Sequence, residues 1–380
     1  MSNFIPGLEL SKLFYIEAVK PIIEAKFPSL DYAAALIGPG SEVLGFDTEM
    51  STDHCWGPRF TLFLGEEDLE QFGQSIDRFL RQELPHSFRS YPTHCSQPDP
   101  NDNGTWRLEP LKEGEVNHAI QISTIRKYLM DHIGFDIEEP IETADWLTIP
   151  EQKLRTLRSD QVFHDDIGLR EVLDRFAWYP RDVWLYMLAS GWNRVGQEEH
   201  LMGRAGSVGD EVGSAIIASR LVRDLMRLCF LMEKQYAPYP KWLGAAFSKL
   251  NCGADLLPIF TEVLAARTWQ DREKRLIKAY EYVAEMHDNL EIAERISATV
   301  GDFFGRPFKV IHLHGRFAEA LCARIADPSI KRLAEKRLIG SIDQISDNTD
   351  LLSDVSYRPT LRKLYESATR ETPKSSQTTY

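Results

Sequence analysis

The sequence predicts two domains, a small α/β domain followed by an all-α helical bundle domain. The chain has 380 residues, which is more than one compact core usually contains. Short apolar runs typical of strands occur only in the first third of the chain, and amphipathic helical patterns fill most of the remainder. Since 43% of the residues are hydrophobic and 11% are aromatic, both domains can form a packed core.

The α/β domain begins with helical periodicity through residue 30, and Pro21 is expected to kink this helix or to begin a second one. Tyr32–Ile37 is a short apolar run that ends at a Gly-Pro-Gly sequence, as a buried strand entering a loop would. Arg59–Leu64 is the second predicted strand. Glu66–Leu84 is a predicted helix, because acidic residues suit a helix N-terminus.

Residues 85–114 are rich in Pro, Asn, Asp and Gly and are predicted to be mostly loop. A strand at Val116–Ser123 and a helix at Ile125–Gly134 complete the order helix, strand, strand, helix, strand, helix, which is that of a small α/β domain with a small mixed sheet. We therefore place the α/β (α+β) domain at residues 1–150, the helical bundle domain at 151–366 and a disordered tail at 367–380. The bundle helices are predicted at 169–194, 208–236, 241–250, 254–268, 271–299 and 314–326.

The composition narrows the class of protein. The formal net charge of −13 argues against general binding to nucleic-acid phosphates. No apolar run is long enough to span a membrane, and no signal peptide is evident, so we expect a cytoplasmic protein that is not membrane-bound. The five widely spaced cysteines indicate free thiols. His312 and His314 are interpreted as structural residues, because no acidic or cysteine partner nearby completes a metal site. The oligomeric state is not set by the sequence.

The segment from Gly38 to Leu64 carries the chemistry. Gly40-Ser41 follow a predicted strand, and Asp53 precedes the next one. Glycine allows a close backbone approach to phosphate, and the Ser41 hydroxyl and neighbouring N–H groups can bind anionic oxygens. Carboxylates near such a loop can hold divalent cations that align a nucleophile and a leaving group.

This arrangement resembles the active-site signature of the nucleotidyltransferase superfamily related to DNA polymerase beta. The string from Gly40 to Arg59 and later segments, including 144–152, 162–165 and 236–242, are similar to an uncharacterised, domain-of-unknown-function branch of that superfamily with a C-terminal helical domain. The resemblance implies a nucleotidyltransferase fold, with Mg²⁺ and a nucleoside triphosphate as cofactor and substrate if the family chemistry survives, and otherwise no cofactor. It implies catalytic roles for Asp53 and His54, with Asp53 as a metal ligand.

The sequence departs from the family pattern at the metal site. Cys55 occupies the position of the second carboxylate, and Gln121 stands where a third is expected. Magnesium prefers several oxygen ligands, so one aspartate is a poor site. Asp47 and Glu49 lie in the same loop and could substitute.

The candidate ligand-binding residues are Gly40, Ser41, Asp47 and Arg59 in the α/β domain, and Arg204, Asp210 and Lys241 in the helical domain. Arg204 and Asp210 lie in a Gly-rich stretch that could line a cleft or could be a solvated loop with Asp210 as an N-cap. Lys241 could reach a phosphate or carboxylate. Trp56 is expected to pack beneath the loop.

We therefore expect a nucleotidyltransferase-fold protein that acts on a small molecule in an interdomain cleft, with degenerate metal-dependent nucleotidyl transfer. One alternative is a repurposed metal-independent enzyme of natural-product biosynthesis, for example a cyclase or isomerase that holds a reactive substrate conformer. The other alternative is a non-catalytic binding protein.

Overall fold

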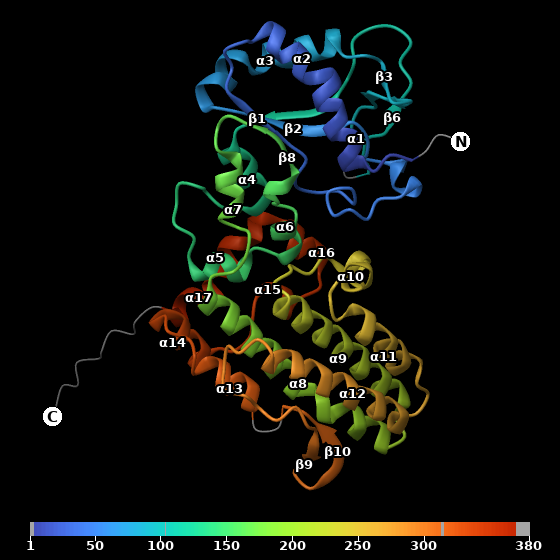
Figure 1. Cartoon of the computed structure of the whole chain (residues 1–380), viewed down its shortest axis with the longest axis vertical. Coiled ribbons are helices and arrows are strands. Elements are labelled where there is room, and N and C mark those ends of the chain that lie inside the picture. The colour runs from blue at the N-terminus through green and yellow to red at the C-terminus, as the bar shows by residue number, and fades with distance from the viewer. Residues whose placement is uncertain (1–3, 103, 313–314, 370–380) are drawn as a thin grey trace, which may run out of the picture. The chain divides into compact units, whose positions relative to one another are not determined.

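A computed structural model describes residues 4–102, 104–312 and 315–369, and its contacts divide the chain into two compact units (Figure 1). We call residues 1–140 with 153–177 the sheet unit, and residues 141–152 with 178–380 the helical unit. The predicted disordered tail at 367–380 is wrong for its first three residues, because helix α17 (Arg358–Thr369) continues through them, and residues 370–380 lie outside the described residues.

The sheet unit is built on a four-stranded mixed sheet with the order β7-β2-β1-β8. Its strands are β1 (Tyr32–Ala35), β2 (Arg59–Leu64), β7 (Ala119–Ser123) and β8 (Val162–Asp165). β1 is antiparallel to both β2 and β8, whereas β2 and β7 are parallel. The sequence predicted the first three strands. It missed β8, a four-residue segment whose strand conformation depends on pairing with β1 and not on a local pattern.

Helices of the sheet unit follow the predicted order, and the first one is interrupted where the sequence suggested. A π-helical turn at Tyr15–Val19 separates the first two helices, and Pro21 lies in the first turn of the second, where its missing N–H is tolerated. The helices are α1 (Gly7–Phe14), α2 (Lys20–Lys26), α3 (Glu66–Glu83), α4 (Ile125–Ile133) and α7 (Leu169–Asp174). A further helix, α6 (Glu151–Arg155), begins in the helical unit and ends in the sheet unit. The sheet unit also contains two 3-10 helices and four two-residue strands: η2 (Glu49–Asp53), η3 (Ser159–Gln161), β3 (Ser87–Phe88), β4 (Tyr91–Pro92), β5 (His94–Cys95) and β6 (Leu108–Glu109).

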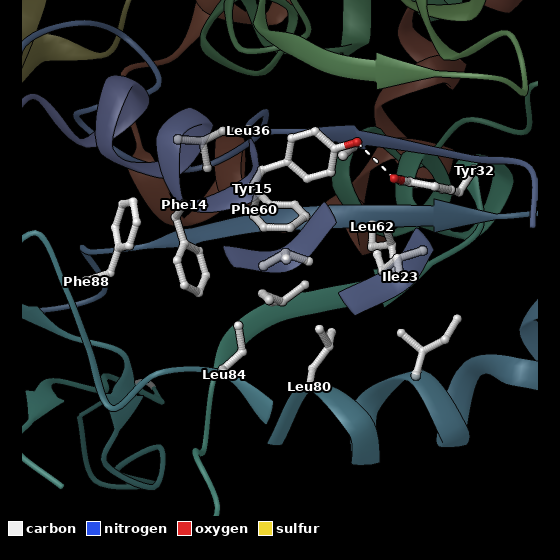
Figure 2. Close-up of a cluster of buried hydrophobic side chains, with 14 of the residues drawn as sticks. Phe14, Tyr15, Ile23, Tyr32, Leu36, Phe60, Leu62, Leu80, Leu84 and Phe88 are labelled. Carbon is white, nitrogen blue, oxygen red and sulfur yellow. Dashed lines mark hydrogen bonds between the residues drawn. The ribbon is translucent and has the colours of Figure 1, made fainter. Parts of the chain in front are cut away.

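The main core of the sheet unit lies on one face of the sheet. Alternate side chains of β2, including Phe60 and Leu62, point to this face and pack against residues of α1, the π-turn, α2 and α3 (Figure 2). The buried hydroxyls of Tyr15 and Tyr32 satisfy each other through a 2.9 Å hydrogen bond. Burial of the Tyr15 side chain raises its pKa. Helices therefore cover this face of the sheet with apolar contacts.

The helical unit is dominated by long helices that pack side by side (Figure 1). The central helix α8 buries an unbroken run from Val183 to Trp192, as expected for a helix surrounded by others. Its helices are α5 (Thr143–Thr148), α8 (Arg181–Ser207), α9 (Glu211–Met232), α10 (Pro240–Phe247), α11 (Gly253–Ala265), α12 (Trp269–Asp288), α13 (Arg316–Cys322), α14 (Pro328–Lys336), α15 (Ile342–Ile345), α16 (Thr349–Ser353), η5 (Val355–Tyr357) and α17 (Arg358–Thr369). Among the described residues, no helix has the length and apolar character needed to cross a membrane.

Two sequence expectations for the helical unit are corrected. The predicted helix at 271–299 ends at Asp288. A hairpin of β9 (Gly301–Phe303) and β10 (Arg306–Val310) follows in a region where no strands were expected. Gly305 has a φ of 74° at the hairpin turn, a conformation that glycine adopts without strain. Hairpin pairing therefore replaces the continued helix.

The division between the units differs from a single boundary at residue 150. The carboxylate of Asp145 accepts hydrogen bonds from Arg358 and Arg362, and the Glu151 N–H donates to Asp343 at 2.9 Å. These contacts attach residues 141–152 to the helical unit. The chain then returns to the sheet unit because β8 completes the sheet.

Candidate functional site

The loop after β1 has a conformation that only glycine adopts readily. Gly38 and Gly40 have φ angles of 91° and 146°. A Cβ atom on Gly40 would lie 2.4 Å from Nη2 of Arg59, which is closer than real contacts allow. Glycine at position 40 is therefore required by both the backbone and the approach of Arg59.

Arg59 is the first residue of β2 and is held beneath this loop by a buried ion pair. Its Nε donates to Oε1 of Glu42 at 2.8 Å, and its Nη2 donates to the same oxygen and, at 2.6 Å, to the Pro39 carbonyl. The Glu42 side chain is 2% exposed and that of Arg59 is 16% exposed. Because this pair is mostly desolvated, its geometry fixes the guanidinium firmly.

Several donors at the loop remain unused. Nη1 of Arg59, the Ser41 hydroxyl, and the backbone N–H groups of Gly40 and Ser41 donate to no acceptor in residues 4–102, 104–312 and 315–369. Consecutive unpaired backbone N–H groups beside an arginine form a common binding geometry for oxyanions. The arrangement can therefore bind an anionic or strongly polar oxygen group.

Asp47 accepts hydrogen bonds from two other segments of the sheet unit. Its Oδ2 accepts hydrogen bonds from the Gly7 N–H at 2.7 Å and from Nε1 of Trp56 at 3.0 Å. Trp56 is 1% exposed and stacks on Phe4, so it packs under the loop as expected. In the structure Asp47 thus connects the N-terminal helix to the loop.

Asp53 and His54 lie on the exposed end of η2. Their side chains are 66% and 56% exposed, and Nδ1 of His54 lies 2.9 Å from Oδ1 of Asp53. This hydrogen bond lowers the pKa of the Asp53 carboxyl. Within the described ranges, neither residue forms a hydrogen bond or an ion pair with Arg59 or Ser41.

These residues do not fit the paired magnesium ions that the nucleotidyltransferase resemblance implies. Cys55, which has a φ of 47°, and Gln121, which lies on β7 opposite Thr61, both lack the carboxylate that a magnesium ligand at these positions would supply. In the part of the chain that the structure describes, no group of three or more His, Cys, Asp or Glu side chains could hold a metal ion. The described residues therefore provide no site for a pair of magnesium ions.

The candidate residues of the helical unit have local roles. Arg204 is exposed in the last turn of α8, not in an interhelical loop as the sequence suggested. Asp210 is the N-cap of α9 and accepts the Gly213 N–H at 2.7 Å. Lys241 is exposed near the start of α10, and its Nζ lies 4.9 Å from the ring of Trp242.

The structure therefore brings together Gly40, Ser41 and Arg59 from the predicted set. It adds Glu42, which the sequence analysis did not single out. The only sequence signal for Glu42 is its place between the glycine loop and the apolar residues Val43 and Leu44. An acid followed by buried apolar residues is a candidate for a buried ion pair, but its partner becomes evident only when the sheet forms.

Two comparisons place the chain among known proteins. Residues 146–243 match a family described as a domain of unknown function, DUF4037, which fits the uncharacterised family suggested by the sequence. The chain is also similar to Ribonuclease D of Cronobacter turicensis, with 29% identity over 149 residues, or 34% of this chain and 39% of that protein. The match thus spans well under half of the relative's length.

Proposed function

We propose that the sheet unit binds a small molecule through an oxyanion group, using a nucleotidyltransferase-like loop that no longer relies on paired magnesium ions. The observation that supports this most directly is the set of unused donors at Gly40, Ser41 and Arg59. Four donors from three neighbouring residues suit the oxygens of a phosphate or carboxylate.

The charge at the loop favours a modestly charged ligand. The Arg59 guanidinium is paired with the Glu42 carboxylate, so together they contribute no net charge. A triphosphate is usually neutralised by divalent cations and several basic groups. A carboxylate or a single phosphate group is therefore the better match, and a triphosphate should bind more weakly.

The likeness to a ribonuclease does not change this proposal. It covers about a third of the chain, and an acidic protein is a poor general binder of phosphate backbones. Metal-assisted phosphodiester cleavage would need a cluster of ligands that the described residues do not contain.

Isothermal titration of the full chain tests the proposal. ATP, GTP, CTP, UTP, inorganic phosphate and phenylacetate are titrated with and without Mg²⁺. We expect binding of at least one of these anions that is insensitive to Mg²⁺ and about tenfold or more weaker in Ser41→Ala, which removes a single donor.

Ser75→Ala is the matched control, because Ser75 is a partly exposed serine of α3 and lies outside the loop. It should bind as the wild type does. Absence of binding by every anion would contradict the proposal, and strictly Mg²⁺-dependent nucleotide binding would favour the ordinary family chemistry instead.

A further inference from the structure

The helical unit contains a cavity of about 250 Å³ that none of the roles above uses. The lining includes Asn193, Gln197 and Glu199 from about two turns of α8, Phe303 from the β9–β10 hairpin and His312 from the segment after β10. The volume is below the roughly 300–1,000 Å³ of sites for drug-sized molecules, so the cavity suits a smaller ligand.

Glu199 places a buried carboxylate at this cavity without a cationic partner. Its side chain is 4% exposed, and it accepts the Ile311 N–H at 2.6 Å and the His312 N–H at 3.1 Å. No lysine, arginine or histidine in the described ranges forms an ion pair with it. The nearest basic influence is Arg316, whose Nε and Nη2 are occupied by the carbonyls of Ile311 and Thr299. Burial raises the pKa of Glu199 to about 7.

His312 adds a second unused polar group to the cavity lining. It is 4% exposed, and neither ring nitrogen has a hydrogen-bond partner among the described residues. Its ring stacks on Trp192 and Phe317, which fixes the imidazole plane. Burial lowers the pKa of His312 to about 4, so the ring is neutral and offers one donor and one acceptor.

Buried polar groups in proteins are nearly always hydrogen-bonded, and an unpaired buried carboxylate is strongly disfavoured. Among the described residues, the Glu199 oxygens accept hydrogen bonds only from two backbone N–H groups, and the His312 imidazole on the same cavity has no partner. A ligand can therefore supply a counter-charge and a further hydrogen bond. A cation would neutralise the Glu199 carboxylate, and His312 accepts or donates one further hydrogen bond. Phe303, whose ring stacks on His200 with the Arg306 guanidinium 5.8 Å from its centroid, contributes apolar surface to the lining.

We propose that this cavity of the helical unit binds a small organic ammonium ion that carries an apolar or aromatic group. The ammonium group pairs with the Glu199 carboxylate, and the apolar group lies against the phenyl ring of the hairpin. The amide side chain of Gln197 and the imidazole of His312 provide polar contacts at the edge of the ligand. This site is independent of the oxyanion site proposed for the sheet unit.

Binding of three matched probes to the full chain tests the proposal: phenethylamine, its neutral analogue 2-phenylethanol and the anion phenylacetate. The measurement is ligand-observed NMR titration at pH 8, above the pKa of Glu199. We expect phenethylamine to bind at least about tenfold more tightly than either of the other probes. Glu199→Gln should weaken phenethylamine binding by about tenfold or more and leave 2-phenylethanol unchanged.

Glu198→Gln is the matched control, because Glu198 is the adjacent buried acid of α8, pairs with Arg220 and is absent from the cavity lining. It should bind phenethylamine as the wild type does. Gly196→Ala is a second variant: its Cβ would lie 2.6 Å from Cδ2 of His312 and displace the imidazole, so it should weaken amine binding without removing a charge.

Phenethylamine that fails to bind at about 10 mM, or that binds no better than 2-phenylethanol, would overturn the proposal. Equal loss of binding in Glu199→Gln and Glu198→Gln would also overturn it, since a general change in the bundle would then explain the result. Binding of phenylacetate that is lost in Ser41→Ala concerns the sheet unit and leaves this test unaffected.

Discussion

The loop of the sheet unit and the cavity of the helical unit use buried charge in opposite ways. At the loop, Glu42 and Arg59 satisfy each other, and the unused groups are donors at its surface. At the cavity, Glu199 is buried and forms no ion pair with any residue that the structure describes, and the unused groups there include both ring nitrogens of His312. The first arrangement fixes a binding surface in advance, whereas the second leaves a charge for a ligand to neutralise.

The largest expected effect comes from breaking the ion pair of the loop. Glu42→Ala leaves the Arg59 guanidinium partly buried and unpaired, which should lower the free energy of unfolding by about 3–5 kcal/mol. The double variant Glu42→Ala/Arg59→Ala should lose clearly less than the sum of the two single variants. Urea unfolding measures both.

Glu17→Ala is the control for this experiment, because Glu17 forms an exposed ion pair with Arg89. It should cost about 1 kcal/mol or less. A similar small loss for Glu42→Ala would show that the buried pair does not fix the loop.

The next effect is a pH dependence of stability that originates in the cavity. The pKa of Glu199 is about 7 in the folded chain, above the value of 4.5 for a free glutamate. The folded state therefore holds this proton more tightly, and stability from this group is present below about pH 4.5 and is lost as the pH rises through 7. The loss is on the order of 3 kcal/mol.

Glu199→Gln should lack this slope, so the stability difference between the two proteins should change between pH 5 and pH 8. Other groups near Glu199 are Glu198 and His200 on α8, Tyr280 on α12, and His312 and Arg316 after β10. All are present in both proteins, so their contributions largely cancel. Parallel pH profiles for the two proteins would contradict a buried, unpaired Glu199.

A smaller effect is expected at the N-cap of α9, because the Asp210 side chain there hydrogen-bonds within its own helix. Asp210→Ala removes the acceptor of the Gly213 N–H and should cost about 1 kcal/mol. Asp210→Asn keeps a capping oxygen and should cost only a few tenths of that. Thermal unfolding distinguishes the two, and equal losses would contradict the capping role.

The smallest effect is expected for Arg204, which is exposed in the last turn of α8. Arg204→Ala should change the free energy of unfolding by no more than about 0.5 kcal/mol. A larger loss of free energy in urea unfolding would contradict this prediction and would mean that Arg204 has a structural partner.

Local patterns were sufficient for much of the fold. The break at Pro21, the strand at Arg59–Leu64 and the helix from Glu66 were predictable because each depends on a restricted backbone or on a regular apolar period. The strand β8 and the hairpin β9–β10 were missed, because their conformations depend on pairing with partner strands and not on a local pattern.

The candidate site shows the same division. Gly40, Ser41 and Arg59 were selected from their spacing, and the structure places them together. The spacing also selected Asp47, which packs against Trp56 and Gly7, because a loop sequence does not state which way a carboxylate points. Glu42 was not selected, since its burial depends on where the sheet forms.

The sequence by itself determined that the chain has an α/β part and a helical part, and that Cys55 and Gln121 stand where the family resemblance leads us to expect carboxylates. Those features are local or compositional. Only the tertiary structure decided which charges are neutralised and which are not. Glu42 and Glu199 are both buried glutamates, yet within the described residues only Glu42 forms an ion pair with an arginine, because pairing depends on contacts between segments far apart in the chain.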